Sequence, residues 1–224
     1  MMPIETIIFD MDGVLVDSEV YWGQSRIEFA KDRAKVWTDE FQREAMGQST
    51  IGWATVMKNR LNLEESTDEI IAEMKARVIA HYEAKMPARE GALEAVHLAS
   101  KHYKVGLASG SPTDIIQRVM QLTGLDQVFE TMVYGDTVPK GKPAPDIYIE
   151  AMKRLNTSPD VTLGIEDSAN GIRALKAAKM YSIAAPSPDF PLPEDILNMV
   201  DAHITELTEF SLDLIKQIES SKED

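Results

Sequence analysis

Four clusters of polar residues carry the side chains that could bind a phosphate group together with a metal ion. They contain Asp10 and Asp12, Ser109 and Gly110, Lys142, and Glu166 and Asp167. Carboxylates that meet at one site repel each other and are costly to bury without a cation. A hard ion such as Mg²⁺ meets this need, because it binds one or two carboxylates and accepts phosphate oxygens. A single acidic pair is more often a helix cap or a solvated loop, so the prediction depends on all four clusters meeting.

Asp10 and Asp12 are separated by one residue at the end of an apolar segment. In a regular strand, side chains two residues apart point to the same face of the sheet. At the end of a strand the chain is no longer bound by that rule. One carboxylate can then hold a metal ion while the other serves as an acid or base. The pair therefore favours a division of labour between two neighbouring carboxylates.

The elements that position these clusters are short apolar segments, which we interpret as buried strands. Helical periods separate them, and alternating strands and helices predict an α/β protein with a parallel sheet. Ligands of such sheets bind beyond the carboxyl ends of the strands, where the polar clusters lie. The three clearest strands span residues 6–9, 103–108 and 161–165. Three weaker candidates span residues 131–134, 182–184 and 202–204.

One stretch, residues 17–87, shows helical signals only. Within it, Ser66 and Glu69 have the spacing of a capping box at the start of a helix. A crossover between parallel strands needs only about a dozen residues, so this stretch is too long to be one. We therefore expect a helical domain over residues 17–87, inserted into an α/β domain made of residues 1–16 and 88–224.

The composition excludes several classes of function. The 224 residues include 23 Lys and Arg against 37 Asp and Glu, for a net charge of −14, and no Cys. So acidic a protein is repelled by nucleic acids and by anionic membrane surfaces. The lack of Cys excludes thiolate catalysis and Cys-ligated metals. With no secretory signal and no apolar run of about 20 residues, we expect a cytoplasmic protein without an obligate protein partner.

The polar clusters resemble the four signature motifs of the haloacid dehalogenase superfamily, in the same order and over nearly the whole chain. Within it, the chain looks like the branch of β-phosphoglucomutase and the small sugar-phosphate phosphatases. The resemblance implies a Rossmann-like three-layer core with an inserted helical cap domain. The matching segments are Asp10-Met11-Asp12-Gly13-Val14-Leu15-Val16-Asp17-Ser18, Ser109, Lys142-Pro143-Ala144-Pro145-Asp146 and Gly164-Ile165-Glu166-Asp167-Ser168.

The resemblance also implies roles for the acidic residues. Asp10 would attack phosphorus and form an aspartyl-phosphate, while Asp12 would protonate the leaving group and then activate water. Mg²⁺ would be held by Asp10, the backbone carbonyl of Asp12 and Asp167, with Glu166 contributing directly or through water. Because the halide-displacing members lack the second Asp, the presence of Asp12 disfavours dehalogenation.

Further residues would bind the substrate. Ser109, Gly110 and Lys142 would bind the phosphoryl oxygens, and Trp22 and Gly47 would contact the remainder of the substrate from the cap. Trp22 either stacks on a sugar or packs inside the helical domain, and its sequence context does not choose between these.

Two cap positions bear on the reaction type. The mutase has a His shortly after the first motif and an Arg after a cap glycine, and here those places hold Trp22 and Thr50. The missing Arg favours a phosphatase, because a mutase must hold a second phosphate. A shift of a few residues in this comparison would bring Arg43 or Arg60 to that place instead.

We therefore expect a Mg²⁺-dependent phosphatase that hydrolyses a hexose or deoxyhexose phosphate through an aspartyl-phosphate. A phosphosugar mutase is the alternative enzyme. A catalytically silent binding module is disfavoured, because every reacting position of the motifs is filled.

Overall fold

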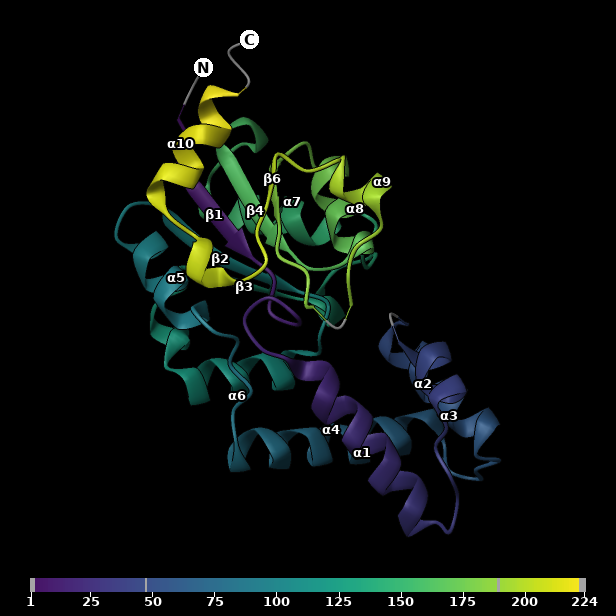
Figure 1. Cartoon of the computed structure of the whole chain (residues 1–224). Helices are drawn as coiled ribbons and strands as arrows, with labels where there is room; N and C mark the ends of the chain where they lie inside the picture. Colours follow the sequence, from purple (N-terminus) through teal and green to yellow (C-terminus); the bar gives the residue numbers. More distant parts are fainter. Residues whose placement is uncertain (1–2, 47, 189, 222–224) are drawn as a thin grey trace. The chain divides into compact units, whose positions relative to one another are not determined.

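The chain divides into two compact units. A computed structural model describes residues 3–46, 48–188 and 190–221. One unit, here the α/β unit, comprises Met1–Asp17 and Pro87–Asp224, and the other, the helical unit, comprises Ser18–Met86 (Figure 1). The two segments of the α/β unit that adjoin the helical unit pair with each other, since the Asp17 amide donates to the Pro87 carbonyl at 2.8 Å.

A six-stranded parallel sheet forms the centre of the α/β unit, in the order β3-β2-β1-β4-β5-β6. The prediction of a parallel α/β sheet is confirmed. This strand order, with β1 between β2 and β4, is that of a Rossmann-like fold. The strands are β1 (Thr6–Phe9), β2 (Lys104–Ser109), β3 (Thr131–Tyr134), β4 (Thr162–Glu166), β5 (Tyr181–Ala184) and β6 (Ala202–His203).

Two strands extend one residue further than the apolar pattern predicts. β2 ends at Ser109 and β4 ends at Glu166, each a polar residue whose side chain is fully buried. Their polar atoms are hydrogen-bonded inside the unit, which allows them to continue a buried strand. Hydrophobicity alone therefore places the end of each strand too early.

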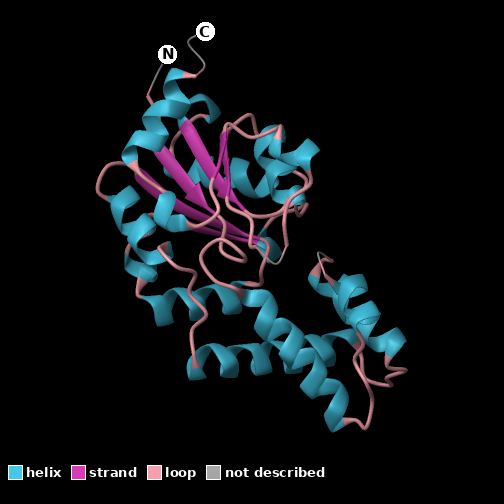
Figure 2. Cartoon of the chain, in the orientation of Figure 1, coloured by secondary structure: helices cyan, strands magenta, loops and turns pink. Residues whose placement is uncertain are grey.

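Helices cover both faces of the sheet, which gives three layers (Figure 2). Alternate side chains of β1 face opposite layers: Ile8 belongs to a core cluster with residues of α7 and α8, whereas Phe9 packs edge-on against Phe129, with 6.1 Å between ring centroids. The α-helices of this unit are α5 (Ala92–Ser100), α6 (Thr113–Thr123), α7 (Asp146–Leu155), α8 (Ala169–Ala177), α9 (Glu194–Leu197) and α10 (Leu212–Ser220). Short 3₁₀ turns span η1 (Leu125–Gln127), η2 (Gly135–Thr137), η3 (Pro159–Val161) and η4 (Leu207–Glu209).

The strand register brings three carboxyl ends to the same level. Phe9 lies beside Leu107 of β2 and Ile165 of β4. The residue after Phe9, Asp10, is therefore level with Glu166, the last residue of β4, and with Ala108, one residue before the end of β2. After β1 the chain adds β2 and β3 on one side of it, and then adds β4, β5 and β6 on the other side. The strand order therefore reverses between β1 and β4, and open α/β sheets bind ligands at such a point.

The helical unit contains four α-helices among its described residues: α1 (Ser18–Asp32), α2 (Asp39–Ala45), α3 (Thr50–Arg60) and α4 (Thr67–Ala84). The predicted capping box starts α4, because Ser66 accepts from the Glu69 amide while the Glu69 carboxylate accepts from the Ser66 amide. The α4 face with Ile70 and Met74 is buried. Among the described helices of the whole chain, none has the length and apolar character to cross a membrane.

Replacing Ser66 with Ala should lower the free energy of unfolding of the helical unit by about 1 kcal/mol, because an orphan amide at the start of α4 loses its acceptor. Chemical denaturation measures this. Ser220→Ala is the matched control, since the Ser220 hydroxyl bonds a carbonyl near a helix end and caps no amide. Equal stability of the two variants would contradict the prediction.

Candidate active site

Asp10 directly follows β1, and its carboxylate is buried at the carboxyl edge of the sheet. The Asp10 amide donates to the Ile165 carbonyl at 3.0 Å, which continues the pairing of β1 with β4 and fixes the backbone. The residue is 4% exposed. Lys142 Nζ donates to its Oδ1 at 2.6 Å. Asp10 is thus a rigidly placed carboxylate with a cation on one oxygen.

Lys142 reaches the same point from the segment between β3 and α7. Its Nζ also donates to the Ala108 carbonyl at 3.2 Å and to Glu166 Oε1 at 2.5 Å. Burial lowers the pKa of Lys142, but the carboxylates of Asp10 and Glu166 outweigh it, and the pKa stands well above its usual range. The side chain is therefore a charged ammonium held between two carboxylates.

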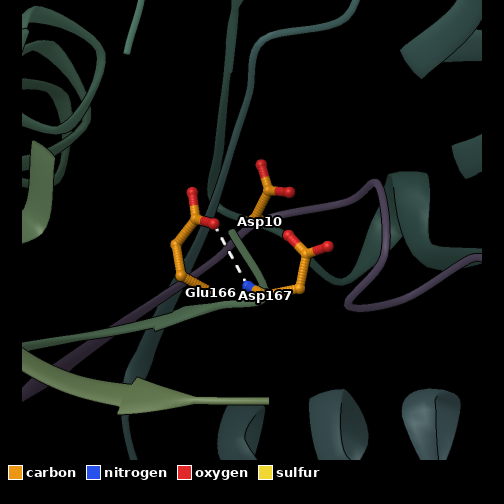
Figure 3. A group of neighbouring side chains, drawn as sticks. All are labelled: Asp10, Glu166 and Asp167. Carbon is orange, nitrogen blue, oxygen red and sulfur yellow. Dashed lines mark hydrogen bonds between the residues drawn. The ribbon is translucent and has the colours of Figure 1, made fainter. Parts of the chain in front are cut away.

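Glu166 is fully buried, and both of its carboxylate oxygens have hydrogen-bond partners. Oε1 accepts from Lys142 and from the Tyr148 hydroxyl at 2.7 Å. Oε2 accepts from the amide of Asp167 at 3.1 Å (Figure 3) and from the amide and hydroxyl of Ser168. A Cβ at Gly171, in the first turn of α8, would lie 1.8 Å from the Glu166 carboxyl carbon. The Glu166 carboxylate is therefore held in place by hydrogen bonds to both of its oxygens and by the close approach of Gly171.

Asp167 lies against the loop that follows β1. A Cβ at Gly13 would lie 1.9 Å from Asp167 Oδ2, and Gly13 has φ of +74°, so a side chain there is excluded by both space and conformation. Burial raises the pKa of Asp167 well above its usual range, and the nearby charges of Glu166 and Asp10 act in the same direction.

The acidic cluster fits a divalent metal ion. Carboxylate oxygens of Asp10, Glu166 and Asp167 lie within 4.8 Å of one another, and Figure 3 shows the three side chains gathered at the ends of their strands. Burial raises the pKa of Asp10 to about 8, and the carboxylates of Glu166 and Asp12 add to this while Lys142 opposes it. One ammonium does not balance three acidic side chains, of which Asp10 and Glu166 are buried and Asp167 is half-buried. Oxygen ligands of this kind are those that Mg²⁺ prefers.

Asp12 is held by two hydroxyl groups. Its Oδ2 accepts from Ser109 Oγ at 2.9 Å and from Ser111 Oγ at 2.7 Å. The other oxygen, Oδ1, is buried without a hydrogen-bond partner. A buried acceptor left in this state is costly, so this oxygen is suited to bind a proton or a ligand donor.

The structure brings together most of the residues predicted from sequence. Those at the carboxyl edge of the sheet are Asp10, Asp12, Ser109, Gly110, Lys142, Glu166 and Asp167. Trp22 belongs to the helical unit, where it is 6% exposed and its ring centroid lies 5.4 Å from that of Trp53. Gly47 lies outside the described residues.

Three contributions to the site were not predicted. Ser111 directly follows the predicted Ser109 and Gly110, and its hydrogen bond to Asp12 was not predicted. Tyr148 has the apolar spacing of a helix core residue, and that pattern does not indicate the hydrogen bond that its hydroxyl donates to Glu166. Gly13 stands inside the first motif, and the residue type, glycine, was the only sequence signal for the positive φ found there.

Comparison with known proteins identifies the family. The sequence model of the haloacid dehalogenase-like hydrolases matches residues 4–179. The chain belongs to this family. Among its relatives, the phosphorylated carbohydrates phosphatase of Thermotoga maritima is 31% identical over 215 residues, which are 88% of this chain and 98% of the relative. Hexitol phosphatase B of Escherichia coli K12 is 31% identical over 211 residues, 91% of this chain and 93% of the relative.

Two solved structures have the same fold as this chain. CbbY from Rhodobacter sphaeroides, in complex with phosphate, has a TM-score of 0.83 at 22% identity, with 95% of this chain and 99% of that chain covered. β-Phosphoglucomutase from Clostridium difficile has a TM-score of 0.81 at 21% identity, with 99% of this chain and 100% of that chain covered. With its family and phosphatase relatives, the prediction that the chain is a phosphatase of the haloacid dehalogenase type is confirmed.

The Gly13→Ala substitution should lower phosphate release by about 10- to 100-fold, the range typical for disturbing the support of a metal ligand, because the new methyl group displaces Asp167. Gly141→Ala is the matched control, since a Cβ there meets nothing within 4 Å. Steady-state assays at saturating Mg²⁺, with circular dichroism to check folding, compare the two. A folded Gly13→Ala protein as active as the control would contradict the placement of Asp167.

Proposed function

We propose that this protein is a Mg²⁺-dependent phosphatase of small phosphorylated carbohydrates, and that it forms an aspartyl-phosphate on Asp10. The observation that carries the proposal is the buried Asp10 carboxylate, which lies with Asp167 on one side and the Lys142 ammonium 2.6 Å from its Oδ1. A second carboxylate, Asp12, follows at the same edge of the sheet. A nucleophile, a cation and an acid–base group are thus assembled in one place.

Asp10 is suited to act as a nucleophile because its backbone is fixed and one of its oxygens is held by Lys142. In the first step, a carboxylate oxygen of Asp10 forms a bond to phosphorus as the bond from phosphorus to the substrate oxygen breaks. The electron pair of that bond leaves on the substrate oxygen, which takes a proton from Asp12. Two displacements of this kind replace one more difficult direct hydrolysis.

In the second step, Asp12 takes a proton from water, and the water oxygen attacks the phosphorus of the aspartyl-phosphate. The bond from phosphorus to Asp10 breaks, which returns the carboxylate and releases inorganic phosphate. The hydroxyls of Ser109 and Ser111 hold Asp12 Oδ2, so its other oxygen is the one available to carry the proton. Lys142 supplies positive charge to phosphoryl oxygens beside Asp10.

Mg²⁺ would be held by Asp10, Asp167 and the backbone carbonyl of Asp12. When bound, the ion supplies the positive charge that lets an anionic carboxylate approach an anionic phosphate ester. Because both oxygens of Glu166 already accept hydrogen bonds, Glu166 serves chiefly to hold Lys142 and to contribute negative charge.

The substrate class rests on the relatives. Two of them, each about one third identical over most of the chain, are named for phosphorylated carbohydrates and for hexitol phosphates. We therefore place hexose, deoxyhexose and hexitol phosphates first. Thr50 stands here where β-phosphoglucomutase has its cap Arg. Because an Arg is suited to hold the second phosphate that a mutase needs, we rank hydrolysis above transfer to a second position of the sugar.

Asp10→Asn should remove phosphate release on every substrate of a sugar-phosphate panel, because an amide nitrogen or oxygen does not replace the nucleophilic carboxylate. Asp213→Asn is the matched control, since that side chain is 82% exposed in the same unit. Phosphate release is measured with Mg²⁺ present, and circular dichroism checks the fold. A wild-type protein that converts β-glucose 1-phosphate into glucose 6-phosphate faster than into free phosphate would show a mutase instead.

Removing the metal should weaken phosphate binding. With Mg²⁺ chelated by EDTA, an anion meets the acidic cluster without its divalent cation, so the affinity for inorganic phosphate should fall by at least about 10-fold, equivalent to about 1.4 kcal/mol. Isothermal titration with inorganic phosphate, in Mg²⁺ and in EDTA, measures the difference. The same affinity in both buffers would contradict a metal-dependent site.

A further inference from the structure

Arg89 donates hydrogen bonds to four backbone carbonyls on three separate segments of the α/β unit. Its Nη1 donates to the carbonyls of Gly13 and Ala185, the latter at 2.8 Å. Its Nη2 donates to the carbonyls of Pro186 at 3.4 Å and Thr205 at 3.2 Å. These carbonyls follow β1, β5 and β6, so one guanidinium joins the loops at the carboxyl edge of the sheet.

The Gly13 peptide connects Arg89 with the acidic cluster. Gly13 follows Asp12 in the chain, and its Cα lies directly against the Asp167 carboxylate, with no room for a side chain between them. Its amide donates to the Val16 carbonyl at 2.8 Å, which closes the loop. The Gly13 peptide is therefore held between the guanidinium of Arg89 and the side chain of Asp167.

A second route leads from Arg89 to Glu166. The Ala185 amide donates to the Glu166 carbonyl at 2.7 Å, and the Ala185 carbonyl accepts from Arg89. The same guanidinium thus restrains the peptide that pairs with the end of β4. Both acidic residues at this end, Glu166 and Asp167, are supported by segments that Arg89 binds.

The backbone of Arg89 is itself fixed. Its amide donates to the Leu15 carbonyl at 2.9 Å, and the neighbouring residue Ala88 forms an antiparallel bridge with Val16. The guanidinium therefore extends from a restrained backbone, and charge-assisted bonds from such a group are stronger than bonds between neutral partners.

Several other arginines of this acidic chain bind carboxylates. Arg33 and Arg77 both contact Glu73, and Arg154 contacts Glu150. By contrast, the hydrogen-bond partners of Arg89 are carbonyl oxygens of loops. A planar guanidinium with several donors is suited to join several carbonyls at once, which an ammonium does less well.

We propose that Arg89 is a positioning residue of the metal site, which acts through the Gly13 peptide to hold the Asp12 carbonyl and the Asp167 carboxylate in place. It does not touch the reacting atoms. The inference rests on the proposed Mg²⁺-dependent phosphatase function and adds to it a residue outside the four motifs.

Arg89→Gln tests the assignment, with Arg89→Lys as the variant that keeps the charge and some donors. Arg154→Gln is the matched control, because Arg154 also binds one backbone carbonyl, that of Met132, but lies on α7 away from these loops. Two quantities are measured for each protein: the Mg²⁺ concentration that gives half-maximal phosphate release, and the rise in Tm on adding Mg²⁺ without substrate.

We expect Arg89→Gln to need about 10-fold more Mg²⁺ for half-maximal release, the lower end of the range for residues that support metal ligands, with Arg89→Lys between it and the wild type. Its Tm should rise less on adding Mg²⁺ than that of the wild type, since less ion binding means less stabilisation. Arg154→Gln should match the wild type in both measurements.

A purely structural role predicts a different result. Arg89→Gln and Arg89→Lys would then have a lower Tm by equal amounts with and without Mg²⁺, and an unchanged Mg²⁺ requirement, which would overturn the assignment. A wild-type protein that releases phosphate equally well in EDTA would instead overturn the proposed metal-dependent function, and the assignment of Arg89 with it.

Discussion

The site depends on the burial of more negative than positive charge at one edge of the sheet. Asp10, Glu166 and Asp167 lie close together, and the ammonium of Lys142 donates to the first two of them. Burial raises the pKa of Asp10 and of Asp167, which means that the protein alone does not compensate for the cost of ionising them. Such an arrangement costs stability and makes the binding of a cation favourable. A protein with a net charge of −14 could thereby bind an anionic phosphate ester at this one place.

Close packing keeps these charges together. The parallel register sets the ends of β1 and β4 side by side, and two glycines then let the chain approach the carboxylates: Gly13 lies against Asp167, and Gly171 lies against Glu166. A methyl group at either glycine would overlap the acidic side chain. Arg89 adds a restraint from outside by joining the loop of Gly13 to the segments after β5 and β6. The acidic cluster is thus preorganised by backbone contacts together with the side chains of Lys142, Tyr148 and Ser168.

Sequence patterns predicted the parts of this arrangement that are local. β1 spans the residues predicted from its apolar run, and polar residues after β1, β2 and β4 indicated which edge carries the site. The ends of β2 and β4 were placed one residue early, since Ser109 and Glu166 are polar yet buried and hydrogen-bonded. The contacts of Tyr148 with Glu166 and of Arg89 with Gly13 join residues distant in the chain, and no periodicity or spacing reports such pairs. They become visible only when the sheet is assembled.

The stability of an Asp167→Asn variant tests the central claim most directly. If ionising this cluster is costly without a cation, replacing Asp167 with a neutral amide of similar shape should raise Tm in EDTA at neutral pH above that of the wild type. The same variant should lose most of the rise in Tm that Mg²⁺ gives the wild type. An Asp167→Asn protein less stable than the wild type in EDTA, or equally stabilised by Mg²⁺, would contradict the account.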